Sequence, residues 1–154
     1  MLQLGNQEWT VLITPGHHPG HVCLLSEAGL IAGDMVAGIG TILIPPGTGD
    51  MDVYIEQLQR LQQLDPHLMF PSHGPVIPLP QKTLAYYVKH RMERHQRVLD
   101  AVDFGLSTVA DISVEAYANT PDAHPGLAQD QTLAHLLSHE RAGRVQQTNK
   151  GWIR

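Results

Sequence analysis

Apolar residues in the first third of the chain alternate in short runs that are typical of β-strands. The run Trp9–Ile13 is strand-like and ends at Thr-Pro-Gly. Two further apolar runs flank a Glu-Ala-Gly turn, which predicts a β-hairpin with strands at 22–26 and 30–32. Residues 41–46, TILIPP, are expected to form another short strand or an extended segment.

The apolar spacing then changes to that of helices. Residues 52–64 place apolar side chains near helical spacing, with Asp50 or Asp52 available as N-cap, so a helix is predicted there. A short buried strand is expected at 68–70, before a Pro/Gly-rich loop. The segment 81–104 contains no helix breaker and ends before a glycine, which predicts a long helix.

The C-terminal part of the chain follows a different order of elements. Two short helices are predicted at 108–118 and 132–142, and the sequence GRVQQTNKGWIR predicts a β-hairpin that turns at 149–151. Helix, helix and hairpin in this order suggest a small winged-helix module. The predicted domains are therefore 1–80, a long linking helix at 81–104, and a winged-helix-like domain at 105–154.

Composition excludes several classes of protein. The 154 residues carry a net charge of −5, so no strong positive field would recruit nucleic acid or an anionic membrane. No signal peptide and no apolar span of membrane length is recognised, which predicts a cytoplasmic protein without a membrane partner. The single cysteine, Cys23, lies in an apolar strand and is expected to be a buried structural thiol.

Three loop residues beside predicted strands could bind a metal ion. His17 precedes the first hairpin strand, Asp34 follows the second, and His73 follows the strand at 68–70. Imidazole and carboxylate groups suit zinc, manganese or iron. Their spacing matches no local motif, and from the residues alone a turn-forming role is the simpler explanation for Asp34.

The order of three sequence motifs changes this interpretation. TPGHHPGH, AGDM and PSHGPVI closely resemble the third, fourth and fifth motifs of the metallo-β-lactamase-fold hydrolases. The segments GTILIPPGTGDMDVYIEQLQRL and YYVKHRMERHQRVLDAV are similar to the β-lactamase-like protein 2 branch, which also resembles some thioesterases of polyketide pathways. The resemblance extends over essentially the whole chain. It implies an α/β (α+β) fold: half of an αββα sandwich, followed by the long helix and a small winged-helix domain.

The resemblance also implies a role for each candidate ligand. His17 would bind the first metal ion, Asp34 would bridge both ions as the catalytic carboxylate, and His73 would bind the second. The two zinc ions of a complete family site would share a hydroxide that attacks an acyl or phosphoryl centre. His18 and His21 would either support the ligands from behind or lie at the mouth of the site, and His21 is the candidate substrate contact.

One family motif has no counterpart in this chain. The second motif, His-x-His-x-Asp-His, supplies four ligands and is absent, as is the N-terminal half of the family fold. We therefore expect the chain to represent the C-terminal half of such a hydrolase, with a partial or empty metal site and near-background activity alone. Its apolar strands would be incompletely covered, which predicts a homodimer.

The predicted long helix carries a basic face. It includes Lys82, Lys89, Arg91, Arg94 and Arg97. A solvated amphipathic surface is the simpler interpretation. The alternative is a positive rim, in which Lys89, Arg91 and Arg94 steer an anionic substrate such as a coenzyme A thioester or RNA. The C-terminal module has about as many acidic as basic residues, so binding of duplex DNA is not expected.

Two functions are compatible with the sequence. The first is a metal-dependent hydrolase that cleaves thioesters or phosphodiesters in its complete form. The second is a non-catalytic binding or assembly module that uses the winged helix and the basic helix, while the metal ligands are silent. The upstream coding sequence distinguishes them, because an in-frame His-x-His-x-Asp-His motif would favour the hydrolase.

Overall fold

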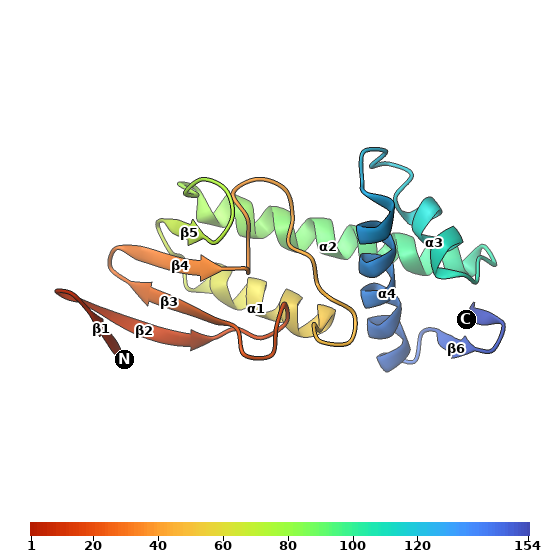
Figure 1. The fold of residues 1–154 in the computed structure, drawn as a ribbon, viewed down its shortest axis with the longest axis horizontal. Coiled ribbons are helices and arrows are strands. Elements are labelled where there is room, and N and C mark those ends of the chain that lie inside the picture. Colours follow the sequence, from red (N-terminus) through yellow and green to blue (C-terminus); the bar gives the residue numbers. More distant parts are fainter.

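A computed structural model describes residues 1–154 and contains a mixed five-stranded sheet (Figure 1). The order of its strands is β1 (Leu2–Leu4), β2 (Gln7–Ile13), β3 (Val22–Ser26), β4 (Gly29–Gly33) and β5 (Met69–Pro71). Strands β1 to β4 are antiparallel neighbours, whereas β5 lies parallel to β4. Because β4 and β5 end at the same end of the sheet, the loops that begin at Asp34 and Ser72 start side by side.

Four helices and a second, two-stranded sheet complete the fold. They are α1 (Met51–Gln63), α2 (Pro80–Asp103), α3 (Val109–Ala116), α4 (Pro125–Arg141), β6 (Gln146–Thr148) and β7 (Gly151–Ile153). In Figure 1 the five-stranded sheet lies at one end of an elongated molecule, and α3 and the β6–β7 hairpin lie at the other. The long helix α2 connects the two ends. None of the helices combines the length and apolar character needed to cross a membrane.

Most predicted elements are confirmed, and one helix boundary needs correction. Asp50 is the N-cap of α1, since its Oδ1 accepts hydrogen bonds from the N–H groups of Asp52 at 3.0 Å and Val53 at 3.2 Å. Residues 41–46 form no strand, so of the two alternatives only an extended segment remains. Helix α4 begins at Pro125 rather than at 132. Proline at the first helical position loses no hydrogen bond and has a suitable φ angle, so it starts this helix instead of preventing it.

The main hydrophobic core lies between the five-stranded sheet and helices α1 and α2. It joins apolar side chains from all three, including Leu12, Leu30, Met69, Tyr54, Leu58, Leu61 and Leu84. The opposite face of the sheet leaves Val11, Ile13 and Val22 exposed. The helices therefore cover one face of the sheet, as expected for half of a sandwich.

A second hydrophobic cluster surrounds the C-terminal half of α2. It contains Val98 and Val102 of α2, Ile112 of α3, Leu136 of α4 and Trp152 of β7. Helix α2 contributes to both clusters and so links the two parts of the fold. The order helix, helix, hairpin matches the expected module, and its assignment as a winged-helix domain remains a prediction.

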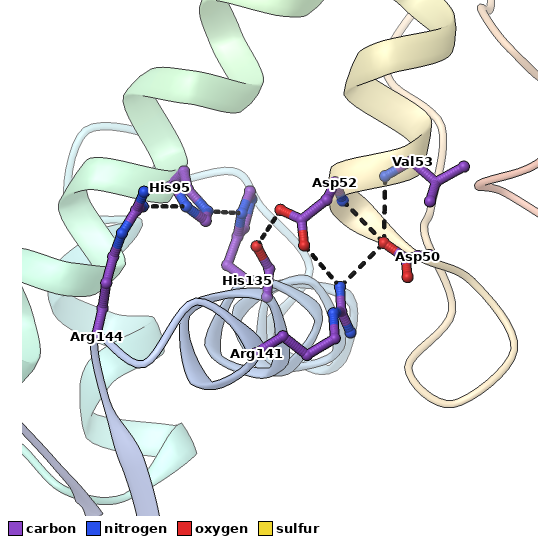
Figure 2. Close-up of polar contacts among 8 residues, drawn as sticks. Asp50, Asp52, Val53, His95, His135, Arg141 and Arg144 are labelled. Atoms are coloured by element: carbon purple, nitrogen blue, oxygen red, sulfur yellow. Dashed lines mark hydrogen bonds and ion pairs between the residues drawn. The ribbon is translucent and has the colours of Figure 1, made fainter.

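Polar contacts also connect α4 to the other helices (Figure 2). Arg141 donates hydrogen bonds to Asp50 and Asp52 at the start of α1, both at 2.9 Å. On the α2 side, the Nδ1 atoms of His95 and His135 lie 3.1 Å apart. Helix α4 is therefore attached to the first part of the fold by charged groups and to α2 by buried imidazoles.

Candidate metal centre

Asp34 lies between two imidazole rings just after β4. Its Oδ2 is 3.8 Å from Nε2 of His17, and its Oδ1 is 3.3 Å from Nε2 of His73. The His73 side chain is 72% exposed, so this group of residues opens to solvent. The structure thus brings the three candidate ligands together from three loops, as expected. Their role as metal ligands remains a prediction.

The chemistry of these atoms fits a divalent cation. Oδ1 of Asp34 is buried and accepts no hydrogen bond. Nδ1 of His17 lies 2.8 Å from the carbonyl oxygen of Leu43, so Nδ1 carries a proton and donates there, and Nε2 is the nitrogen with the free lone pair in the neutral tautomer. The Nε2 lone pair and the Asp34 carboxylate then face each other. A cation between them would relieve this unfavourable arrangement.

Asp34 directs a different oxygen to each histidine. No group of three or more His, Cys, Asp or Glu side chains is arranged to hold one metal ion. The three side chains therefore form a partial site at most. Tetrahedral zinc needs four ligands, so a metal ion here would need further ligands beyond these three side chains.

His21 holds the backbone of Asp34 in place. Its Nε2 accepts the Asp34 N–H at 3.0 Å, and its Nδ1 lies 2.8 Å from Oγ1 of the buried Thr14. Burial, together with the nearby His17 ring, lowers the pKa of His21 and keeps the ring neutral. Both ring nitrogens are occupied inside the protein, so neither is free for the expected substrate contact.

Two glycines allow the loops to approach this closely. Gly33 has a φ of +55°, and a Cβ at this position would lie 2.6 Å from Nε2 of His21. Gly16 has a φ of +131°, and its Cβ would lie 2.4 Å from Cα of Tyr54 in α1. Larger residues would therefore separate His21 from Asp34 and lift the His17 loop off α1.

Two tyrosines that the sequence did not single out fix the loop after Asp34. The Tyr54 hydroxyl donates to the carbonyl of Met35 at 2.7 Å. The Tyr87 hydroxyl accepts the Ala37 N–H at 2.9 Å and donates to the carbonyl of Gly40 at 3.0 Å. These contacts join residues far apart in the chain, and no local pattern signals them.

The basic face of α2 is solvated only in part: Lys82, Lys89 and Arg97 are exposed, and two of the proposed rim residues are not. Arg91 and Arg94 are only 2% and 4% exposed, because α3 and α4 pack against this side of the helix. Lys89 alone of the three proposed rim residues is exposed, and it lies 3.7 Å from Glu93 one turn later. The helical spacing identified a basic face but could not show which elements cover it.

Cys23 is completely buried, as expected. Its Sγ lies 3.3 Å from Oγ1 of Thr14 and donates to the carbonyl of Ala32 at 3.4 Å. Burial raises the pKa of the thiol to about 11, so the thiolate is scarce at neutral pH. Cys23 is therefore a packing residue beside the site.

The sequence comparisons with known proteins agree on one family. Residues 3–73 match the Metallo-beta-lactamase superfamily. A Drosophila melanogaster protein named beta-lactamase-like protein 2 homolog is 31% identical over 91% of this chain and 50% of its own length. An Aspergillus fumigatus protein named atrochrysone carboxyl ACP thioesterase is 32% identical over 59% of this chain and 28% of its own length.

Solved structures show the same fold. A metallo-beta-lactamase family protein of Thermus thermophilus superposes with a TM-score of 0.83 at 23% identity, covering 99% of this chain and 51% of that chain. The present chain thus spans about half the length of the Drosophila relative and about half of this structure. The mixed α/β fold expected from the sequence is confirmed.

Proposed function

The chain belongs to the metallo-β-lactamase superfamily, and on this premise we propose that it carries part of the active site of a metal-dependent hydrolase. One observation supports this proposal above all others. Asp34 lies between His17 and His73 and directs a different oxygen to each ring. A carboxylate in this position suits a bridge between two metal positions, with one histidine at each.

His17, Asp34 and His73 are the residues that would hold metal, with zinc as the first candidate. A bound divalent metal would supply Lewis acidity and lower the pKa of water. The chain's own residues prepare this position: the Leu43 carbonyl orients the His17 ring, and His21 holds the Asp34 backbone. Such supporting contacts keep the ligands in place without rearrangement.

We propose an acyl thioester as the substrate class. The name of the Aspergillus fumigatus relative supports this choice over a phosphodiester. The three candidate ligands are too few for a complete site, so the chain by itself is expected to hold metal weakly. Strong turnover would then require ligands from elsewhere.

Metal binding by the chain tests the proposal. We expect the His17→Gln, Asp34→Asn and His73→Gln variants each to weaken Zn²⁺ binding about tenfold or more, because each removes one ligand from an already small set. Isothermal titration calorimetry measures the affinity. His67→Gln is the matched control, since His67 is exposed and precedes β5 instead of following it. Equal Zn²⁺ affinity in wild type and Asp34→Asn would contradict the proposal.

Turnover provides a second readout. We expect hydrolysis of acetyl-coenzyme A by the Zn²⁺-loaded chain to stay within about tenfold of the rate with Zn²⁺ alone. Fast hydrolysis that survives Asp34→Asn would show that this site is not responsible. Preferential cleavage of an activated phosphodiester would replace the thioester assignment while leaving the metal centre intact.

A further inference from the structure

A cavity lies between α2 and the segment that joins α3 to α4. Its volume is about 430 Å³, and its lining includes Tyr86, His90, Arg91, Arg94, Tyr117 and His124. Gly40 and Thr41 also line it and belong to the loop that follows Asp34. A neighbouring cavity of about 390 Å³ shares Gly40, Thr41 and Tyr86 and adds Lys82. The Asp34 loop therefore borders both cavities.

Two buried arginines border the larger cavity without an acidic partner. Arg91 donates to Oε1 of Gln131 at 2.7 Å and to the carbonyl of Ile42. Arg94 donates to the carbonyl of Ala116 and to Oγ1 of Thr120 at 2.9 Å. All these acceptors are neutral. The Nε atom of each arginine is buried and has no hydrogen-bond partner.

Such charges are costly to bury without a counter-ion. Burial lowers the pKa of Arg94, and the Tyr117 ring, 3.7 Å from its guanidinium carbon, offsets only part of this cost. Asp122 is the single acidic residue in the lining, whereas burial and the two arginines lower the pKa of His90, so its ring adds little positive charge. This concentration of basic groups contrasts with the net charge of −5 for the whole chain.

We propose that this cavity binds the phosphate group of a small organic ligand, with Arg91 and Arg94 providing the opposing charge. Guanidinium groups are well suited to phosphate because they form charge-assisted hydrogen bonds and stay protonated. The volume suits a phosphorylated small molecule. The rings of Tyr86 and His90 stack at 5.8 Å and 25°, which provides a flat wall for the organic part.

The Asp34 loop relates this cavity to the candidate metal centre. Residues 37–41 run from that centre to the cavity wall and are fixed by Tyr87. A coenzyme A or phosphopantetheine thioester carries a phosphate and a thioester in one molecule. Binding of the phosphate end of a thioester substrate in this cavity therefore rests on the proposed function. Phosphate binding itself requires neither metal nor turnover.

Titration of the metal-free chain with inorganic phosphate tests the binding site. At constant ionic strength in chloride, we expect saturable binding that weakens about tenfold in Arg94→Gln, since one buried charge is removed. Because Arg94→Gln removes the bond to Ala116, Leu127→Trp provides a second variant. Leu127 is half-exposed in the cavity lining, so the larger ring should block access while both arginines remain. Arg97→Gln is the control, because Arg97 is exposed one turn after Arg94.

The outcomes separate this site from the metal centre. Saturable phosphate binding that is lost in Leu127→Trp and kept in Arg97→Gln and Asp34→Asn supports the proposal, even where Zn²⁺ binding fails. Coenzyme A should bind at least tenfold more tightly than pantetheine, which lacks phosphate. Absent or unsaturable phosphate binding, or equal weakening by Arg97→Gln, would mean that Arg91 and Arg94 are structural only. Tighter binding of a short single-stranded RNA than of coenzyme A would overturn the small-ligand assignment.

Discussion

Asp34 is held in place by hydrogen bonds to the backbone of its turn and not by bonds to its carboxylate. His21 accepts its backbone N–H, and the Tyr54 hydroxyl holds the next carbonyl, that of Met35. The Thr14 hydroxyl contacts Nδ1 on the other side of the His21 ring. The carboxylate therefore faces only the His17 and His73 rings while the turn that carries it is fixed, which suits a group that binds a metal ion.

We predict that His21→Leu destabilises the fold and weakens metal binding. The variant leaves the Asp34 N–H without a partner and leaves the Thr14 hydroxyl only its contact with Cys23, which costs about 1–3 kcal/mol of unfolding free energy. Zn²⁺ affinity should fall about tenfold, as for other residues that orient ligands. Urea unfolding and calorimetry measure the two effects. His18→Leu is the control, because His18 is exposed. Normal Zn²⁺ affinity in folded His21→Leu would show that the turn is held without this ring.

At the scale of elements, α2 and α4 meet through three buried histidines (Figure 2 shows two of them). Arg144 lies 3.3 Å from Nε2 of His95 and donates to it, so His95 Nδ1 carries the proton and donates to His135. His139 stacks on His95 at 3.6 Å and donates from Nε2 to its backbone carbonyl at 2.9 Å. These contacts fit three neutral rings, in which His135 Nε2 and His139 Nδ1 are buried without hydrogen-bond partners. Protonated His95 would oppose an N–H to the Arg144 guanidinium.

We predict that the chain loses stability as the pH falls from 7 to 5. Burial, with His139 and Arg144 nearby, lowers the pKa of His95 to about 4, and burial lowers the pKa of His135 and His139. Unfolded histidines titrate near 6.5, so the unfolded chain takes up more protons over this interval. The unfolding free energy should therefore be highest near about pH 7 to 8 and fall by on the order of 1–3 kcal/mol by pH 5.

Urea unfolding at several pH values measures this dependence. The charged groups around the cluster are Asp52, Arg91, Arg94, Arg144 and Arg154, of which Asp52 alone favours the protonated rings. His95→Phe should flatten the pH dependence, because it removes one titrating ring from the interface. His67→Phe, at an exposed position outside the cluster, should keep the wild-type slope. A stability independent of pH between 7 and 5 would refute the prediction.

At the scale of the whole molecule, one face of the five-stranded sheet is uncovered. Val11 is 42% exposed and Ile13 is 67% exposed, and both lie on the strand β2. An apolar groove of about 470 Å³ on the same sheet is lined by Trp9, Ile31 and Phe70, among others. At about 25 cal/mol per Å², several hundred square ångströms of such surface represent many kcal/mol. The surface therefore favours association with another apolar face.

We predict a homodimer that buries this face. A second copy of the chain presents the same surface, and two-fold symmetry is the commonest way for identical chains to associate. Light scattering at micromolar concentration should give a dimer mass that decreases on dilution. Val11→Lys should yield a monomer, because it places a charge in the interface, whereas Val114→Lys on α3 should leave the dimer unchanged. A wild-type monomer that binds no apolar dye would rule out the dimer.

Most helices and strands, and the candidate ligands, could be predicted from local patterns in the sequence. Apolar spacing is a local property, so it indicated the β3–β4 hairpin, α1 and α2 with bounds close to those observed. The same spacing placed the start of α4 too late in the sequence. The buried face of that helix is largely polar, with Gln131, His135 and His139 among its buried residues, so few apolar positions mark its first turns. The motifs around His17, Asp34 and His73 are also local, and a family resemblance could therefore be recognised in them.

How these residues act together follows from the tertiary structure. The parallel pairing of β4 and β5 brings Asp34 and His73 to one end of the sheet, although they are thirty-nine positions apart in the sequence. The packing of α3 and α4 on α2 buries Arg91 and Arg94, which helical spacing alone placed on an open face. The physical reason is the same in both cases: burial and convergence depend on contacts between distant segments, and local sequence patterns carry no information about which segments meet.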